Sequence, residues 1–389
     1  MLAQALEKSA RSLTCKFLWH VIPVEHSSFV SPRAALISRS SHIVLIEVIL
    51  MNLKLLTAAL CLSAVGLAAG SASAATLGDT KARGTVRCGV NTGLPGFGYQ
   101  NDQGQWAGLD VDYCKAIAAA VFNDASKVVY SPLSAVQRFP ALQNSEVDVL
   151  ARNTTWTMSR DTALGLAFVG VNFYDGQGFM VKKALGVNSA LQLSGATVCV
   201  QSGTTTELNL ADYFAANNMQ YNPVVIEAQS DVNSAYDSGR CDVLTTDQSG
   251  LYASRLELGT PDDHIVLPEI ISKEPLGPAV RQGDDQWFNV VKWTHFALLN
   301  AEELGVTQAN VEEMKASTNP EIRRLLGVEG TFGADAGMSA DFVVNIVKAV
   351  GNYGEIFERN VGTGSQLKIA RGQNALWSKG GLQYAPPIR

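Results

Sequence analysis

A strand-and-helix pattern occurs twice in this chain, and no other feature constrains the fold as strongly. Residues 84–90 (GTVRCGV) and 195–200 (GATVCV) each combine a turn glycine with a short apolar run typical of a buried strand. A glycine-containing loop and then a helix pattern follow each run, at residues 110–122 and at about 205–217. The likeness of the two openings indicates two related structural units.

The later parts of the two units are also alike. Helix patterns at residues 135–144 and 232–238 precede the strand patterns VDVL at 147–150 and CDVL at 241–244. Strands and helices that alternate in this way, twice over, predict an α/β fold of two lobes with parallel sheets. One large doubly wound domain would not explain the recurrence.

Two extended segments containing Gly, at residues 174–181 and 272–280, are typical of chain crossings between lobes, and the second also contains Pro. Helix patterns follow the second crossing, at 284–303, 308–315, 320–326 and 340–359. We expect these helices to complete the first lobe, which gives lobe 1 as residues 75–175 and 276–389, and lobe 2 as residues 176–275. Two crossings at one junction form a hinge, and a ligand cleft is expected beside the strand ends.

The most apolar stretch of the chain, residues 55–69, has the layout of a secretory signal peptide. It follows Lys54 and precedes the small-residue sequence Ala-Ser-Ala at 72–74. A transmembrane anchor is the alternative, but the run is shorter than the ~20 apolar residues that a bilayer requires. Cys61 lies inside the run behind the bulky Leu60, which does not fit a lipoprotein site. We predict a signal peptide at 51–74, with cleavage after Ala74.

Residues 1–50 do not fit in front of a signal peptide, which should begin at the start of a protein. They show no periodicity that would predict an element of structure. Our hypothesis is that translation starts at Met51 and that residues 1–50 are a misassigned extension.

Composition excludes several classes of protein. Apolar residues make up 47% and charged residues 17%, which excludes a long disordered or coiled-coil protein. The formal net charge is −6 and no basic run is present, which argues against nucleic-acid binding. After the apolar stretch at 55–69 the chain contains only two histidines, His264 and His295. A metal site built from histidines or a Ser-His-Asp triad is therefore poorly supported.

Four cysteines follow the predicted cleavage site: Cys88, Cys114, Cys199 and Cys241. An even number in an exported chain predicts two disulfides, for which three connectivities are possible. No pair has C-x-x-C spacing, so zinc-binding and redox motifs are unsupported.

Polar loops at the expected strand ends carry the chemistry of the cleft. In lobe 1, residues 151–161 supply hydroxyls, backbone N–H groups, Arg152 and Arg160, and an arginine binds a carboxylate through two parallel hydrogen bonds. In lobe 2, residues 201–207 lead into a helix amino terminus, which favours anions. Asp247 ends a strand and could accept hydrogen bonds from an ammonium. Together these groups meet the needs of a zwitterionic amino acid.

Each group also has an ordinary structural interpretation. Asp247 could cap the helix that follows it, and Thr204 and Thr205 could be capping residues. Arg160, beside Asp161, could belong to a surface ion pair. Their joint placement at strand ends favours the binding interpretation.

Residues 75–389 resemble the extracellular solute-binding proteins of polar amino acid ABC transporters, family 3. The resemblance is strongest to the broad-specificity general L-amino acid binders, together with the glutamate, glutamine and aspartate binders. It is carried by residues 108–112 (GLDVD), 138–142 (RFPAL), 152–161, 201–209, 245–250 and 276–285. The resemblance implies a type II periplasmic-binding-protein fold that closes on an L-amino acid. It further implies a periplasmic monomer that delivers its ligand to an inner-membrane permease, with no enzyme activity, cofactor or metal.

The resemblance also implies roles for individual residues. Arg160 corresponds to the arginine that clamps the ligand α-carboxylate, aided by the N–H and hydroxyl of Thr155 and by the N–H of Thr205. Asp247 corresponds to the carboxylate that receives the α-ammonium, with help from the Asn153 carbonyl and the Thr155 hydroxyl.

The side-chain pocket departs from the pattern of the family. Gly203 and Thr204 complete the wall of lobe 2. Many members place an aromatic ring over the ligand where this chain has Leu94, with Phe97 three residues later. Arg138 stands where members for smaller substrates carry an apolar residue, and its charge would suit acidic or amide side chains.

Within that framework the disulfides are expected to join Cys88 to Cys114 and Cys199 to Cys241. The first pair would link a strand to the following helix in lobe 1, and the second would link neighbouring strands in lobe 2.

Two other classes of function have less support in the sequence. A dehydratase-like enzyme on the same fold would need a general acid, for which the cleft offers Asp247 and Glu207 but no histidine. A ligand-sensing receptor domain would need a transmembrane segment after the lobes, and residues 361–389 contain none.

Overall fold

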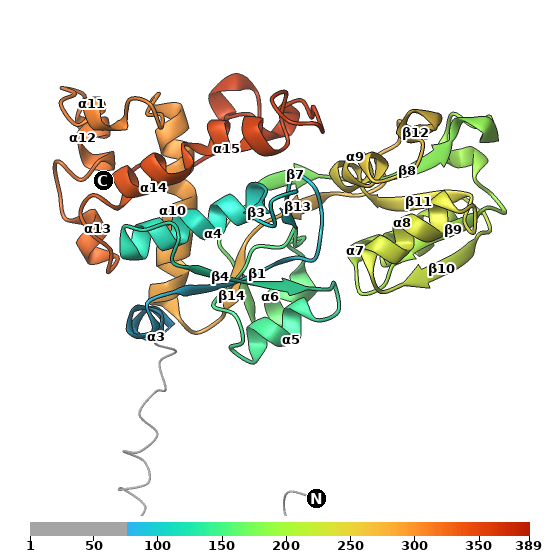
Figure 1. Cartoon of the computed structure of the whole chain (residues 1–389), viewed down its shortest axis with the longest axis horizontal. Helices are drawn as coiled ribbons and strands as arrows, with labels where there is room; N and C mark the ends of the chain where they lie inside the picture. Colours follow the sequence, from blue (N-terminus) through green and yellow to red (C-terminus); the bar gives the residue numbers. More distant parts are fainter. Residues whose placement is uncertain (1–75) are drawn as a thin grey trace, which may run out of the picture. The chain divides into compact units, whose positions relative to one another are not determined.

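The computed structural model describes residues 76–389. The predicted signal peptide at 51–74 and the segment 1–50 lie outside the described residues. Within the described range the chain forms two five-stranded sheets and two short two-stranded ones, with helices packed around them (Figure 1).

The first five-stranded sheet has the strand order β4-β1-β5-β14-β6. Its strands are β1 (Val86–Asn91), β4 (Val128–Leu133), β5 (Val149–Leu150), β6 (Leu166–Phe168) and β14 (Ala279–Arg281). β1 is parallel to β4 and to β5, whereas β14 is antiparallel to β5 and to β6. We call this sheet, with the helices packed on it, lobe 1.

The second five-stranded sheet has the order β10-β9-β11-β8-β12, which matches the first position by position. Its strands are β8 (Gln177–Lys182), β9 (Thr197–Gln201), β10 (Asn222–Ile226), β11 (Val243–Asp247) and β12 (His264–Val266). β9 is parallel to β10 and to β11, whereas β8 is antiparallel to β11 and to β12. This sheet and its helices are lobe 2.

The prediction of two α/β lobes is therefore confirmed, but the sheets are mixed rather than wholly parallel. The register explains why. Gln177, the first residue of β8, pairs with Asp247, the last of β11, and Ala279 of β14 pairs with Leu150 of β5. A strand that enters a sheet from the hinge starts where the parallel strands end, so it runs in the opposite direction.

Two short strands connect the lobes. β7 (Phe173–Asp175) and β13 (Glu274–Leu276) pair antiparallel, with Glu274 opposite Asp175. They lie at the two predicted chain crossings, and Figure 1 shows them between the two groups of elements.

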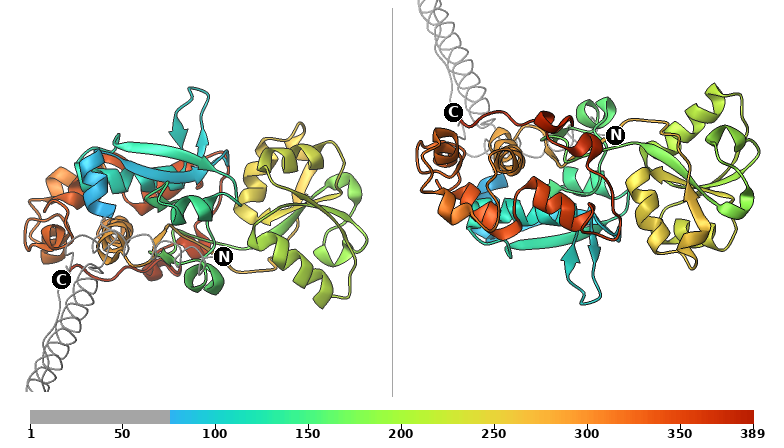
Figure 2. Two further views of the ribbon diagram at one scale, coloured as in Figure 1. Left: turned by 90° about the horizontal axis from the view of Figure 1, so that it is seen from below. Right: turned by 90° about the horizontal axis from the view of Figure 1, so that it is seen from above.

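The helices of the carboxyl-terminal third pack on lobe 1. α10 (Asp285–Glu303), α14 (Phe342–Val350) and α15 (Tyr353–Asn360) all contact α4 (Leu109–Phe122), and the views in Figure 2 show this packing. α14 has a strongly apolar face that joins the same core as Trp287 and β1. Burial of that face supplies the main driving force for this packing.

The remaining α-helices and strands complete the fold. They are α3 (Thr76–Arg83), β2 (Tyr99–Gln100), β3 (Trp106–Ala107), α5 (Arg138–Gln143), α6 (Met158–Thr162), α7 (Thr205–Ala216), α8 (Gln229–Asp237), α9 (Gln248–Leu256), α11 (Val311–Met314), α12 (Pro320–Leu325) and α13 (Phe332–Asp335). The sequence patterns did not predict α3.

The helix predicted over residues 340–359 is broken in two. Gly351 has φ 80°, a left-handed conformation that a helix cannot continue through. Asn352 then caps α15, and its side chain and that of Glu355 form a reciprocal capping box. The sequence signal was present, because Gly followed by Asn and, three residues on, Glu is a typical helix stop and restart.

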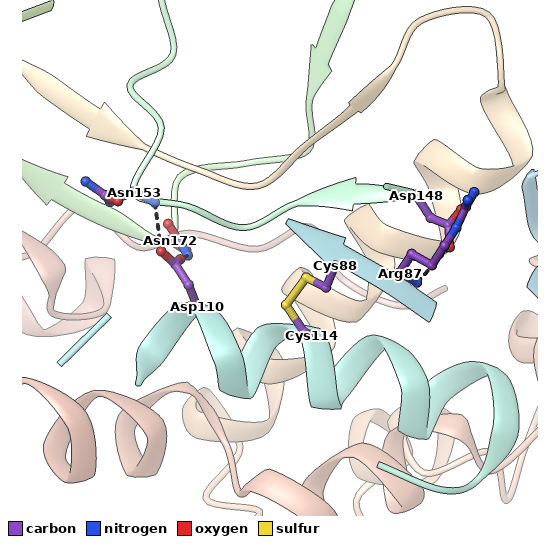
Figure 3. Close-up of a disulfide and its surroundings, with 7 residues drawn as sticks. All are labelled: Arg87, Cys88, Asp110, Cys114, Asp148, Asn153 and Asn172. Carbon is purple, nitrogen blue, oxygen red and sulfur yellow. Dashed lines mark hydrogen bonds and ion pairs between the residues drawn. A yellow bond between two sulfur atoms is a disulfide. The ribbon is translucent and has the colours of Figure 1, made fainter. Parts of the chain in front are cut away.

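The two disulfides have the predicted pairing. Cys88 on β1 is bonded to Cys114 on α4 (Figure 3), and Cys199 on β9 is bonded to Cys241, just before β11. Each bond lies within one lobe, so neither restricts movement of one lobe relative to the other.

Candidate functional site

A cavity lies where strand ends of both lobes meet. Lobe 1 contributes Asn91, Leu94, Arg138, Arg152, Asn153 and Thr155; lobe 2 contributes Gln201, Thr204, Thr205, Thr206, Gln229, Thr246, Asp247, Ser249, Gly250 and Ser254. Many of these residues end β1, β5, β9 or β11 or follow them directly, as expected for a ligand site in an α/β fold.

Asp247 is a buried carboxylate whose negative charge is only partly offset by the nearby Arg138 and Arg160. It is the last residue of β11, it is 8% exposed, and it accepts no hydrogen bond to its side chain from residues 76–389. Although α9 begins at the next residue, Asp247 makes no side-chain capping bond, so the capping interpretation is wrong. Burial, with Asp175 and Glu274 nearby, raises the pKa of the Asp247 carboxyl well above its usual value. A cation in the cavity would stabilise the ionised form.

Two buried arginines from lobe 1 line the same cavity. Arg138, the first residue of α5, and Arg152, in the loop after β5, are each 2% exposed. Arg138 Nε and Arg152 Nη2 have no hydrogen-bond partner within residues 76–389. Burial and the closeness of other arginines lower the pKa of Arg138 well below its usual value, and burial lowers that of Arg152 to about 10. An anionic ligand group would relieve both effects.

Arg160 is not among the residues that line the cavity, although it is close enough for its charge to act on Asp247. It belongs to α6, is 6% exposed, and donates from Nη1 to the Thr155 carbonyl at 2.9 Å. Its guanidinium also lies 5.0 Å from the ring centroid of Phe139. Arg160 is buried and bonds to the Thr155 carbonyl, and it forms no ion pair with Asp161 among the described residues, so the surface ion-pair interpretation is wrong. Most of its N–H donors remain free for a ligand.

Thr155 and Thr205 face each other across the two lobes. Their hydroxyl oxygens are 3.3 Å apart, and both donate to Glu274 Oε2, at 2.6 Å and 2.9 Å. A hydroxyl has one proton, so these groups can accept from a ligand but cannot also donate to one. Their backbone N–H groups make no hydrogen bond to other residues of the described range. The backbone N–H groups of Thr155 and Thr205 are therefore available to bind a ligand carboxylate, as the resemblance implied. The Thr155 hydroxyl is not available to donate to that carboxylate, because its proton is already bonded to Glu274.

A buried network holds the loop after β5 in place. Asn153 has φ 34°, a left-handed conformation that Asn tolerates, and its N–H donates to Asp110 Oδ2 at 2.7 Å (Figure 3). Asp110, at the start of α4, also accepts from Asn172 Nδ2 at 2.9 Å. Burial raises the pKa of Asp110 to about 6. The network holds Asn153 in place beside the cavity.

Five residues were predicted to form the cavity wall and the side-chain pocket, and one of them, Arg138, lines the cavity as described above. Leu94 and Thr204 line the cavity, and Thr204 also caps α7 by accepting from the Glu207 N–H at 3.3 Å. Phe97 does not: it is buried in the core, edge-on to Phe173 with ring centroids 5.2 Å apart. The reason is that Phe97 precedes α4 and packs on the inner side of lobe 1.

Gly203 is also absent from the cavity wall. It is exposed, has φ 72°, and faces Val136 of lobe 1 so closely that a Cβ would lie 2.6 Å from the Val136 Cγ1. Gly203 therefore permits contact between the lobes rather than forming the ligand pocket.

Sequence reasoning missed several polar residues of the cavity. Gln201 and Gln229 end or follow strands of lobe 2, and Ser249 and Ser254 lie on α9; the Ser254 hydroxyl has no partner within residues 76–389. Gly250 and Ser254 are four residues apart, so they lie on one face of the helix. This spacing of small residues is a sequence signal that could have predicted their place in the cavity. Arg152 was noted in the loop but was given no role.

Other chemistries find little support among the described residues. No group of three or more His, Cys, Asp or Glu within residues 76–389 is arranged to hold a metal ion. Glu207, considered as a general acid, lies outside the cavity and accepts from the Gly203 N–H at 3.1 Å. None of the helices in this range is long and apolar enough to cross a membrane.

Comparison with known proteins places this geometry in a family. The general L-amino acid-binding periplasmic protein of Rhizobium johnstonii is 66% identical over 341 residues, covering 87% of this chain and 100% of that protein. The glutamate/glutamine/aspartate/asparagine-binding protein of Rhodobacter capsulatus is 57% identical over 324 residues, covering 83% of this chain and 96% of that protein.

A solved structure gives the same result. The ABC transporter periplasmic binding protein of Brucella ovis with glutathione bound is 66% identical, has a TM-score of 0.80, and covers 81% of this chain and 99% of its own. The model of the bacterial extracellular solute-binding proteins, family 3, matches residues 86–310. The chain belongs to this family of extracellular solute-binding proteins.

Proposed function

We propose that this protein is the periplasmic substrate-binding component of an ABC importer and that it binds L-amino acids in the cavity between its lobes. One observation carries the proposal: Asp247, a buried carboxylate without a hydrogen-bond donor, shares a cavity with the buried and incompletely paired Arg138 and Arg152. An amino acid with an ammonium for Asp247 and side-chain carboxylate or amide oxygens for the two arginines satisfies both sides at once. The names of the relatives point to the same class of ligand.

The backbone of the amino acid is held at two places. Asp247 and the Asn153 carbonyl accept from the α-ammonium, with the lone pairs of the Thr155 hydroxyl as a further acceptor. The N–H groups of Thr155 and Thr205 donate to the α-carboxylate, and Arg160 supplies the charge. The single hydrogen bond from Arg160 to the Thr155 carbonyl also holds the donor loop in position.

The side chain of the ligand extends towards Arg138 and Arg152. Two guanidinium groups with unpaired N–H donors favour an acidic or amide side chain, so glutamate, glutamine, aspartate and asparagine are the preferred ligands within a broad range. Glutathione, bound in the related structure, carries the α-ammonium and α-carboxylate of its γ-glutamyl residue and a further carboxylate. It is thus compatible with the same arrangement.

The cellular arrangement follows from this function. We propose that residues 51–74 are removed as a signal peptide and that residues 75–175 with 276–389, and residues 176–275, act as the two lobes. The closed, ligand-bound monomer docks on a membrane permease. No catalytic step is assigned to the site.

Ligand-induced thermal stabilisation tests the proposal. Residues 75–389 are stripped of bound ligand by unfolding and refolding with the disulfides intact, and then are screened against the twenty L-amino acids and glutathione. A ligand at ~100 times its dissociation constant adds ~2.7 kcal/mol of stability. Shifts with many different amino acids indicate a general binder, and shifts confined to acidic and amide ligands assign selectivity to the arginines. No shift with any ligand would contradict the proposal.

A further inference from the structure

Glu274 stands apart from the residues discussed as ligand contacts. It begins the crossing strand β13, it is 1% exposed, and it does not line the cavity. Its two carboxylate oxygens accept four hydrogen bonds. Oε2 accepts from the hydroxyls of Thr155 and Thr205, and Oε1 accepts from Asn209 Nδ2 at 2.7 Å and from Ser272 Oγ at 2.6 Å.

These donors come from both lobes. Thr155 follows β5 of lobe 1, whereas Thr205 and Asn209 lie on α7 of lobe 2, one helical turn apart. The loop of Thr155 is also tied to β13 itself, because the Trp156 N–H donates to the Pro275 carbonyl at 2.8 Å. Glu274 therefore sits on the hinge and bonds to both sides of the cleft at once.

A second interlobe hydrogen bond provides a contrast. Ser134 Oγ of lobe 1 donates to Glu227 Oε1 of lobe 2 at 3.1 Å, but this contact is exposed to solvent. Water and salt weaken an exposed contact, whereas a buried carboxylate that accepts several bonds loses much more when the bonds break. Of these two contacts, the one at Glu274 can hold the lobes together.

We propose that Glu274 is a positioning residue that latches the closed form of the protein and slows ligand release. Opening the cleft separates Thr205 and Asn209 from Thr155, so the carboxylate must lose donors from one lobe. The latch also orients the two threonine hydroxyls, because both donate their proton to Glu274 Oε2. This inference rests on the proposed function, since a latch has meaning only where the lobes close on a ligand.

The test compares Glu274→Gln with Glu227→Gln in the full chain without its signal peptide. Both substitutions remove a carboxylate that bridges the lobes, but only the first is buried. For E274Q we expect at least a tenfold rise in the dissociation rate of L-glutamate, measured by stopped-flow fluorescence, and little change in the association rate. The affinity for glutamine should fall by the same factor, which leaves the ranking of ligands unchanged. E227Q should change the dissociation rate less than twofold.

Thr205→Val provides a second variant if E274Q folds poorly, as judged by circular dichroism and thermal unfolding without ligand. It removes one donor to Glu274, keeps the backbone N–H, and should raise the dissociation rate severalfold. The double variant should release ligand no faster than E274Q alone, because both changes break the same latch. A wild-type protein that binds no amino acid would contradict the proposed function. A wild-type protein that binds, while folded E274Q and T205V release ligand at the wild-type rate, would overturn the latch alone.

Discussion

The two lobes have the same sheet layout but opposite chemistry at the cleft. The strand order β4-β1-β5-β14-β6 corresponds to β10-β9-β11-β8-β12. At the ends of these strands lobe 1 presents arginines, while lobe 2 presents Asp247 among neutral hydroxyls and amides. The sheets thus bring the loops together, and the loops alone decide what is bound.

The difference is sharpest at the corresponding strands β5 and β11. β5 leads into an irregular loop in which Asn153 takes a left-handed conformation and is held by Asp110. β11 leads directly into α9, so Asp247 stands at a helix amino terminus. A loop can present backbone N–H and carbonyl groups to a ligand, whereas the strand-to-helix junction fixes a single carboxylate. An amino acid requires both kinds of group: N–H donors for its carboxylate and a carboxylate for its ammonium.

The largest effect on ligand affinity is expected from removing the carboxylate that lobe 2 contributes to the cavity. Asp247→Asn leaves the ligand ammonium without a counter-charge, so the affinity for every amino acid should fall by about 3–4 kcal/mol, measured by isothermal titration calorimetry. The variant without ligand should be more stable than wild type, because the raised pKa of Asp247 means that its ionised form opposes folding at neutral pH. Asp262→Asn, on the surface of lobe 2, is the matched control. Unchanged affinity in D247N would show that the ammonium binds elsewhere.

Removing the cation implied for the α-carboxylate should have a somewhat smaller effect. Arg160→Ala should weaken binding of all amino acids alike, by about 2–3 kcal/mol, because the α-carboxylate is common to them. Arg160→Lys keeps the charge but loses the forked geometry and should recover part of the loss. Titration of glutamate, glutamine and alanine against both variants measures this. If affinities barely change in R160A, the α-carboxylate site is misplaced.

Arg138 should change the order of ligands rather than all affinities. Arg138→Met removes the guanidinium at similar length, and the preference for glutamate over alanine should drop by about tenfold, or 1.4 kcal/mol. Competition binding with paired ligands measures the ratio directly. An equal loss for both ligands would assign Arg138 to the common part of the amino acid and not to its side chain.

The last prediction concerns pH. The carboxyl of unliganded Asp247 has a raised pKa, and a bound ammonium favours its ionised form, so binding releases a proton from molecules in which it is protonated. The affinity for L-glutamine should therefore fall as pH falls from 8 to 5, by at most tenfold per pH unit. For unliganded protein the sign is opposite, because this group favours folding at low pH and loses that contribution as pH rises through its raised pKa. Asp110 and Asp175, with pKa values of about 6, also titrate here, so only a dependence that disappears in D247N belongs to Asp247.

Local sequence patterns predicted the parts of the fold and site that depend on neighbouring residues. The repeated openings at residues 84–90 and 195–200 correspond to β1 and β9, the central parallel strands of the two sheets. The polar ends of β5 and β11 pointed to Asn153, Thr155 and Asp247, because parallel strands end at one edge of a sheet.

The remainder depends on tertiary contacts that no local pattern encodes. Glu274 lies in a crossing with Pro and Gly and has no periodic neighbours, and its burial arises only where both lobes converge. An Asp before a helix is a typical cap, so the sequence could not distinguish the uncapped Asp247 from an ordinary one. The resemblance to the family suggested Phe97 for the pocket, but its ring packs against Phe173 in the core of lobe 1.

The central claim is that one cavity binds both charged ends of an amino acid, the ammonium chiefly through Asp247 of lobe 2 and the α-carboxylate chiefly through Arg160 of lobe 1. Calorimetric titration of the refolded wild-type protein with L-glutamate, 2-oxoglutarate and 4-aminobutyrate tests it, because the second compound lacks the ammonium and the third lacks the α-carboxylate. We predict that L-glutamate binds at least 100-fold more tightly than either analogue, which corresponds to about 2.7 kcal/mol. Binding of either analogue as tight as that of L-glutamate would contradict the account.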